Sequence, residues 1–192
     1  MMSMLQRLDQ RITRRALLAS TTMAAAVSVL RAEGTEPEVT IVEFNNAGEK
    51  TGVVQVKKIR HTEAEWRKML TLQQYYVTRK ETSDLAFYGT YFKLTDPGLY
   101  RCLCCGTAAF SSDAKFESKT GFPCFTAPVA EENIRISADP TDEQKRVNVQ
   151  CKRCDAHLGY LYDDGPEPTH KRYCMNESSL KFVPRQKSGA GA

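Results

Sequence analysis

A chain of 192 residues with an ordinary hydrophobic fraction of 41% is long enough for one folded domain with additional segments. This composition excludes a disordered or membrane-embedded class for the bulk of the chain. The formal net charge of +4 comes from residues 1–32, which hold five arginines and one acidic residue, so residues 33–192 are neutral. A nucleic-acid partner is not expected, because binding to phosphates requires a surplus of basic side chains.

Residues 1–32 have the features of an export signal. The pair Arg14–Arg15 precedes an uncharged run over residues 16–30. Fifteen helical residues span about 22 Å, which is shorter than the hydrocarbon core of about 30 Å. We therefore expect a twin-arginine-type signal that directs the chain to the periplasm or out of the cell, with no membrane span after processing. An organellar presequence, which is also rich in arginine and poor in acids, is the alternative.

Residues 33–60 are predicted to be a linker followed by a β-hairpin. β-Branched and apolar residues at 39–44 and 52–59 flank the turn sequence Asn45-Asn46-Ala47-Gly48. Two short helices should follow, because the sequence contains two capping boxes. In a capping box, a threonine and an acid or amide three residues later each accept, through the side chain, a hydrogen bond from the other's backbone N–H. The boxes are Thr62–Glu65 and Thr71–Gln74.

From residue 99 onward, short β-rich runs alternate with turn sequences. This pattern favours a mainly β fold with two antiparallel sheets. The predicted strands cover residues 99–102, 122–126, 134–136, 146–150, 157–162, 172–176 and 180–183. The small and polar tail at 186–192 is expected to be disordered.

Two Cys-x-x-Cys pairs, Cys102/Cys105 and Cys151/Cys154, predict a structural zinc site. Each pair places two sulfurs on one side of a tight turn, and two such turns complete a closed tetrahedral shell around one Zn²⁺. Disulfides between the pairs are the alternative in an exported chain.

Cys174 is the candidate nucleophile among the three remaining cysteines. It follows Arg172 by two residues, and a neighbouring guanidinium favours the reactive thiolate. Taken alone, this signal also fits a buried and inert strand cysteine. Cys104 and Cys124 carry no signal of their own beyond packing.

The ordered motifs between Glu65 and Pro184 resemble the B-type methionine sulfoxide reductases, or peptide-methionine (R)-S-oxide reductases. We expect this domain to span residues 61–185. The motifs that carry the resemblance are Glu65-Trp66-Arg67-Lys68, Tyr76-Val77-Thr78-Arg79, Tyr100-Arg101-Cys102-Leu103-Cys104-Cys105-Gly106, Lys115-Phe116-Glu117-Ser118, Cys151-Lys152-Arg153-Cys154-Asp155-Ala156-His157-Leu158-Gly159, Asp163-Asp164-Gly165-Pro166, Arg172-Tyr173-Cys174-Met175-Asn176 and Leu180-Lys181-Phe182-Val183-Pro184.

The resemblance implies a β-tent fold, the structural zinc, and reduction of methionine sulfoxide in proteins by a thiolate at Cys174. Cys174 would become a sulfenic acid, which a thiol reduces through a disulfide, with a thioredoxin-like protein or another thiol as final donor. Arg172 and Asp164 would face the sulfoxide oxygen, and His157 and Asn176 would line and orient the pocket. Phe122, Tyr160 and Phe182 would complete the substrate pocket of a monomeric enzyme.

Three substitutions depart from the family pattern. Tyr160 stands where the family has a second histidine, and a phenol is a weaker acid than an imidazolium. Phe122 replaces a tryptophan and lacks its N–H donor. Thr120 replaces the usual resolving cysteine, and Cys124, four residues later, is the expected substitute; reduction of the sulfenic acid by external thiols alone is the alternative. A catalytically weak or inactive relative that binds oxidised methionine or a partner protein is the alternative function.

Overall fold

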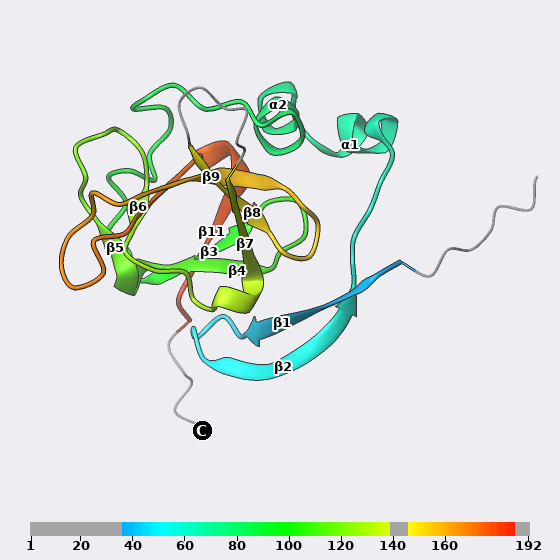
Figure 1. Cartoon of the computed structure of the whole chain (residues 1–192), viewed down its shortest axis with the longest axis horizontal. Helices are drawn as coiled ribbons and strands as arrows, with labels where there is room; N and C mark the ends of the chain where they lie inside the picture. The colour runs from blue at the N-terminus through cyan, green and yellow to red at the C-terminus, as the bar shows by residue number, and fades with distance from the viewer. Residues whose placement is uncertain (1–35, 139–145, 187–192) are drawn as a thin grey trace, which may run out of the picture. The chain divides into compact units, whose positions relative to one another are not determined.

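The computed structural model of the chain describes residues 36–138 and 146–186 (Figure 1). The predicted export segment at residues 1–32 lies outside the described residues, as do residues 187–192 of the predicted tail. Within the described part of the chain, no helix has the length and hydropathy needed to cross a membrane.

Strand β1 (Glu38–Phe44) and strand β2 (Lys50–Lys57) form the antiparallel hairpin that the sequence predicts. The Asn45 side chain closes the turn by accepting two backbone hydrogen bonds, and Gly48 has a left-handed φ of 86°. The Asn133 side chain accepts from the backbone nitrogen of Val42 at 2.7 Å and donates to its carbonyl oxygen at 2.8 Å. These two bonds join the hairpin to the rest of the described fold.

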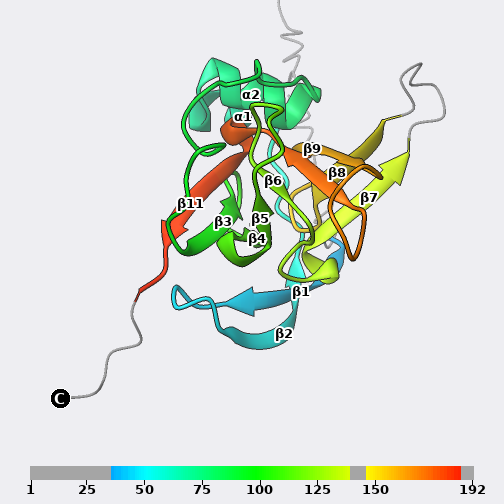
Figure 2. The same cartoon turned by 90° about the vertical axis from the view of Figure 1, so that its left-hand side faces the viewer.

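Both predicted helices are present, as α1 (Glu63–Met69) and α2 (Leu72–Lys80). Each begins at its predicted threonine, and both capping boxes are complete. Helix α2 ends at Glu81, which has a left-handed φ of 57°, a conformation usually taken by glycine at a helix C-terminus. Figures 1 and 2 show the helices at one end of the body and the hairpin at the other.

Two antiparallel sheets make up the body, which confirms the predicted fold class. The larger has the order β5-β6-β10-β9-β8-β7, and the smaller has the order β11-β3-β4. Their bounds are β3 (Gly98–Cys102), β4 (Ala108–Ser111), β5 (Lys115–Phe116), β6 (Cys124–Phe125), β7 (Ile134–Ala138), β8 (Val147–Cys151), β9 (His157–Tyr162), β10 (Arg172–Met175) and β11 (Leu180–Pro184).

An aromatic core fills the space between the two sheets. The fully buried rings of Phe110 and Phe125 stack with centroids 4.6 Å apart, and Tyr100 meets Phe125 edge-on at 4.9 Å. Side chains alternate between the two faces of a strand, and on β10 Tyr173 and Met175 are buried in this core. Arg172 and Cys174 of the same strand therefore project from the opposite face of the larger sheet.

Candidate active site and metal site

A row of side chains crosses the outward face of the larger sheet, and Cys174 lies at its centre. Cys174 of β10 is paired with Cys124 of β6 on one side and with Tyr160 of β9 on the other. Phe116 of β5 lies at one end of the row, and Asn148 of β8 follows Tyr160 in the other direction. Residues directly opposite each other in antiparallel strands point to the same face. The register thus gathers groups from five strands, far apart in sequence, into one line.

The two cysteines of the row are cross-strand neighbours. Met175 N donates to Pro123 O at 3.0 Å, which makes the adjacent Cys174–Cys124 pair a non-hydrogen-bonded pair. In such pairs the Cα atoms are about 4.5 Å apart and the side chains are closest. The neighbouring Cys174 thiol lowers the pKa of Cys124 to about 6, and the neighbouring Cys124 and burial raise the pKa of Cys174. The pair therefore gives up one proton readily and holds the second, so it carries one thiolate at neutral pH.

Arg172 is a fixed cation beside this sulfur pair. Its Nε and Nη2 donate to the two carboxylate oxygens of Asp164 at 2.7 and 2.9 Å. Its guanidinium lies over the ring of Tyr162, 4.2 Å from the centroid. The Arg172 guanidinium also lowers the pKa of Cys124, and its charge favours the thiolate form of Cys174. The bidentate pairing with Asp164 holds the Arg172 guanidinium in one orientation.

His157 reaches the same face because β9 contains a bulge. Gln150 of β8 pairs with His157, whereas Val149 pairs with Gly159, so Leu158 has no partner on β8. Strict alternation would place His157 and Tyr160 on opposite faces, yet their rings are 4.9 Å apart. Bulges commonly redirect a side chain beside an active site.

The His157 imidazole is completely buried and electrically neutral. Desolvation lowers its pKa to about 4. Its Nδ1 lies 2.7 Å from Asn148 Oδ1, while its buried Nε2 has no hydrogen-bond partner among the described residues. The Tyr160 hydroxyl, which stands at the family's second histidine position, donates to Glu81 O at 3.4 Å.

Two of the predicted site residues, Asn176 and Phe182, make their described contacts away from the row of side chains around Cys174. Asn176 is 2% exposed, and its side chain accepts from Asp84 N at 2.8 Å and donates to Leu158 O at 3.4 Å. Phe182 lies on β11 in the smaller sheet, where its ring is 5.0 Å from that of Tyr100. Asn176 therefore supports the backbone behind β9, and the predicted role of Phe182 in the substrate pocket stays a prediction.

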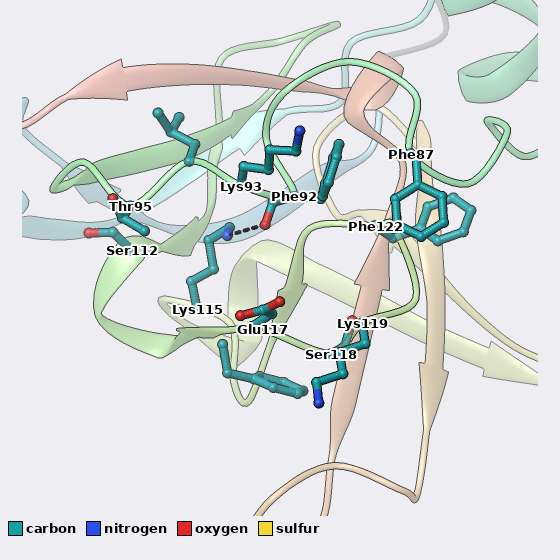
Figure 3. A pocket seen from close by; sticks show the side chains of 13 residues that line it. Phe87, Phe92, Lys93, Thr95, Ser112, Lys115, Glu117, Ser118, Lys119 and Phe122 are labelled. Atoms are coloured by element: carbon teal, nitrogen blue, oxygen red, sulfur yellow. Dashed lines mark hydrogen bonds between the residues drawn. The ribbon is translucent and has the colours of Figure 1, made fainter.

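A pocket of about 440 Å³ opens beside the row, next to Phe116 and Phe122 (Figure 3). This volume is within the usual range for small-molecule sites. Figure 3 shows Phe87 and Phe122 side by side at one end of the pocket. The wall also carries the lysines Lys93, Lys115 and Lys119, and Lys115 donates to a backbone carbonyl at 3.1 Å. The pocket therefore combines aromatic side chains with three lysines in its wall.

The four predicted metal ligands converge on one point. The sulfur atoms of Cys102, Cys105, Cys151 and Cys154 all lie within 4.8 Å of one another. Two of the distances are 3.6 Å (Cys102–Cys154) and 3.4 Å (Cys105–Cys151). A tetrahedral zinc with Zn–S bonds of about 2.3 Å requires sulfurs about 3.8 Å apart, so the cluster fits this ion.

Both cysteine pairs form the same tight turn. The residue after each pair, Gly106 or Asp155, has a left-handed φ and donates its N–H to the carbonyl of the first cysteine, at 2.8 and 2.9 Å. Cys102 ends β3 and Cys151 ends β8, so the four sulfurs join the smaller sheet to the larger one. A metal held there is structural, because all four ligand positions belong to the chain.

Three residues at the site were not predicted from sequence: Asn148, which contacts His157; Tyr162, which contacts Arg172; and Glu81, which contacts Tyr160. Strand alternation alone could have placed Tyr162 on the face of Tyr160, since the two are separated by one residue. Asn148 and Glu81 depend on strand pairing and on the packing of α2 against β9, which single-sequence patterns do not contain.

Comparison with known proteins identifies the family. The SelR domain model matches residues 70–184. A peptide methionine sulfoxide reductase MsrB from Pseudomonas aeruginosa is 47% identical over 121 residues, which cover 63% of this chain and 92% of that protein. The mouse mitochondrial methionine-R-sulfoxide reductase B3 is 44% identical over 133 residues, covering 69% of this chain and 53% of that protein. The SelR domain family comprises the B-type methionine sulfoxide reductases, which are oxidoreductases of the peptide-methionine (R)-S-oxide class. Together with the row of side chains around Cys174 and the four-cysteine cluster, these matches show that the chain belongs to this family.

Proposed function

We propose that the chain reduces methionine (R)-sulfoxide in oxidised proteins, with Cys174 as nucleophile and Cys124 as resolving thiol. The observation that carries this proposal is the cross-strand pairing of Cys174 with Cys124 beside the Arg172–Asp164 pair. In the first step, the Cys174 thiolate attacks the sulfoxide sulfur and the oxygen takes one proton. The sulfur–oxygen bond of the substrate breaks, methionine leaves, and Cys174 becomes a sulfenic acid.

Arg172 would stabilise the oxygen that develops negative charge, while Asp164 fixes its guanidinium. His157 and Tyr160 border the same face, and the pocket beside Phe122 has room for the methionine side chain and a flanking residue of the substrate. Asn176 would act by holding the β9 backbone through Leu158 O rather than by touching the substrate. Burial of His157 favours its neutral form, so this imidazole would serve as a hydrogen-bonding group and not as a cation.

In the second step, the Cys124 thiol attacks the sulfenic sulfur of Cys174, a disulfide forms, and water leaves. Cα atoms about 4.5 Å apart lie within the range of about 4.4–6.8 Å that disulfides span, so the strands need little movement. A thioredoxin-like protein or another thiol donor then supplies two electrons and two protons to restore both thiols. The overall reaction converts a sulfoxide and two thiols into a thioether, a disulfide and water.

A catalytically weak relative that binds oxidised methionine or a partner protein is the second candidate. It is supported by the Tyr160 hydroxyl, whose described hydrogen bond is to Glu81 O and which is a poor acid. General acid catalysis is commonly worth about 10²–10⁴-fold, so its loss would leave a slow enzyme or a binding protein.

Mass spectrometry after addition of one equivalent of a methionine sulfoxide peptide separates these two functions. The enzyme yields one equivalent of methionine peptide and a Cys174–Cys124 disulfide. Cys124→Ser should still reduce one equivalent but retain a sulfenic acid that dimedone traps, whereas Cys174→Ser should reduce none. If the wild type forms no product and Cys174→Ser behaves identically, the catalytic proposal fails.

The accompanying properties are proposals of the same kind. The four-cysteine cluster would hold one structural Zn²⁺, and the neutral body would act as a monomer without a nucleic-acid partner. Residues 1–32 would direct export to the periplasm, with an organellar presequence as the alternative. Export of a reporter fused to residues 1–40 should be lost when Arg14 and Arg15 are both replaced by lysine, and unchanged export would contradict the twin-arginine assignment.

A further inference from the structure

Glu81 occupies a position where its backbone is strained and its side chain is fully engaged. It is the left-handed residue that ends α2, with a φ of 57°. Glycine is the usual residue there because a Cβ atom is unfavourable in this conformation. Non-glycine residues in such conformations gather at functional sites, where surrounding contacts hold them in place.

The contacts of Glu81 all lead toward the active face. Its two carboxylate oxygens accept from Asn148 Nδ2 at 2.9 Å and from Gln150 Nε2 at 2.8 Å. Its backbone carbonyl accepts from the Tyr160 hydroxyl. Glu81, the C-cap residue of helix α2, therefore contacts strands β8 and β9 beside the row of side chains around Cys174.

The hydrogen bond to Glu81 fixes the orientation of the Asn148 amide. A carboxylate only accepts hydrogen bonds, so the Asn148 NH₂ group must face Glu81 and its oxygen must face His157. Because the Asn148 oxygen is also only an acceptor, His157 Nδ1 must be the donor across their 2.7 Å contact. The neutral imidazole then carries its hydrogen on Nδ1 and a free lone pair on Nε2.

This assignment agrees with the surroundings of Nε2. That atom is buried and has no hydrogen-bond partner among the described residues. We infer that Glu81 is a positioning residue, which acts through Asn148 to hold His157 as the Nδ1–H tautomer and leaves Nε2 as a hydrogen-bond acceptor. The use of that acceptor during turnover rests on the proposed function, whereas the tautomer itself does not.

Long-range ¹H–¹⁵N correlation spectra of the resting protein test the tautomer directly. The chain has three histidines, so a His157→Gln variant identifies the His157 signals. We expect the Nδ1–H pattern in the wild type and in Glu81→Gln, whose amide oxygen can still accept from Asn148. In Glu81→Lys, the ammonium requires an acceptor, so the Asn148 amide should rotate and His157 should change to the Nε2–H tautomer. An unchanged Nδ1–H pattern in Glu81→Lys would overturn the inference.

Glu81→Gly separates positioning from folding. Glycine relieves the left-handed backbone, so the Tm should stay the same or rise. The carboxylate is lost, so we expect mixed His157 tautomers and a kcat lowered about tenfold with little change in KM, a size seen for outer partners of functional imidazoles. Asp113→Asn, which removes a carboxylate bonded to Arg185 instead, is the matched control and should change neither property. A single Nδ1–H tautomer in Glu81→Gly would overturn the inference, whereas mixed tautomers with an unchanged kcat would contradict only the catalytic use of His157.

Discussion

The ionisation of the sulfur pair makes the sharpest prediction, because its magnitude follows from one contact. Removal of Cys124 as Cys124→Ala eliminates the neighbouring thiol whose coupling with Cys174 lowers the first pKa of the pair to about 6. Cys174 is then a single, half-buried thiol whose pKa should return toward 9, the ordinary value for a cysteine. At pH 7 the thiolate fraction is about 90% for a pKa of 6 and about 1% for a pKa of 9.

The rate of alkylation by iodoacetamide, followed from pH 4.5 to 9.5, measures this change. We expect a midpoint near pH 6 in the wild type and near pH 9 in Cys124→Ala, since a depressed pKa keeps the thiolate present at lower pH. The midpoint is informative because a less basic thiolate is also a weaker nucleophile, which partly offsets the rate at any single pH. Cys104→Ala removes a thiol outside the pair and should leave the midpoint unchanged. A midpoint that stays near pH 6 without Cys124 would refute the argument and assign the effect to Arg172.

Three further predictions concern His157, Tyr160 and the metal. The pKa of His157 is about 4 in the folded state and 6.5 in the unfolded state, so protonation favours unfolding as the pH falls. Between pH 7.5 and pH 5.5, the free energy of unfolding from urea titrations should fall by about 1.4 kcal/mol more in the wild type than in His157→Gln. Equal losses in the two proteins would contradict a buried neutral imidazole. Tyr160→His should raise kcat at least about tenfold and change KM by no more than about twofold, because an imidazole titrates near the working pH. Steady-state kinetics that show no gain in kcat would mean that Tyr160 does not limit turnover. Cys151→Ser should lose the bound zinc and lower the Tm by more than about 10 °C in a thermal shift assay, since four thiolates join the two sheets. As the control, Cys104→Ser should retain one zinc per chain and a Tm within about 3 °C of the wild type.

Local chemistry made the helices and the metal site predictable from sequence. Both capping boxes depend on residues three positions apart, and the structure contains them as expected at Thr62 and Thr71. The Cys-x-x-Cys turns are equally local, and their sulfurs meet as the spacing indicates. Most of the strands were predicted as well, because their apolar runs end at turn residues.

Other features depend on contacts between distant segments and could not be predicted. Strands β4 and β5 were missed, because Ala108–Ser111 is only four residues long and Lys115–Phe116 only two. The pairing of Cys174 with Cys124 rests on a register of β6 and β10 that no sequence period specifies. Phe182 was assigned to the substrate pocket by resemblance, but its described ring contacts are with Tyr91 and Tyr100.

The bulge in β9 shows how the backbone itself builds the site. Gly159 can lie where it does only without a side chain, because a Cβ atom there would be 2.2 Å from Cys174 O. The close approach of β9 and β10 brings Tyr160 beside Cys174, and the extra residue, Leu158, turns His157 toward Asn148. Asn148 in turn lies three residues before Cys151, a predicted metal ligand at the end of the same strand. With a metal bound as proposed, the four-cysteine cluster would fix the end of β8, the strand that carries Asn148, which in turn orients His157. A cluster whose four sulfurs all serve structure would then affect the chemistry through the strand that it anchors.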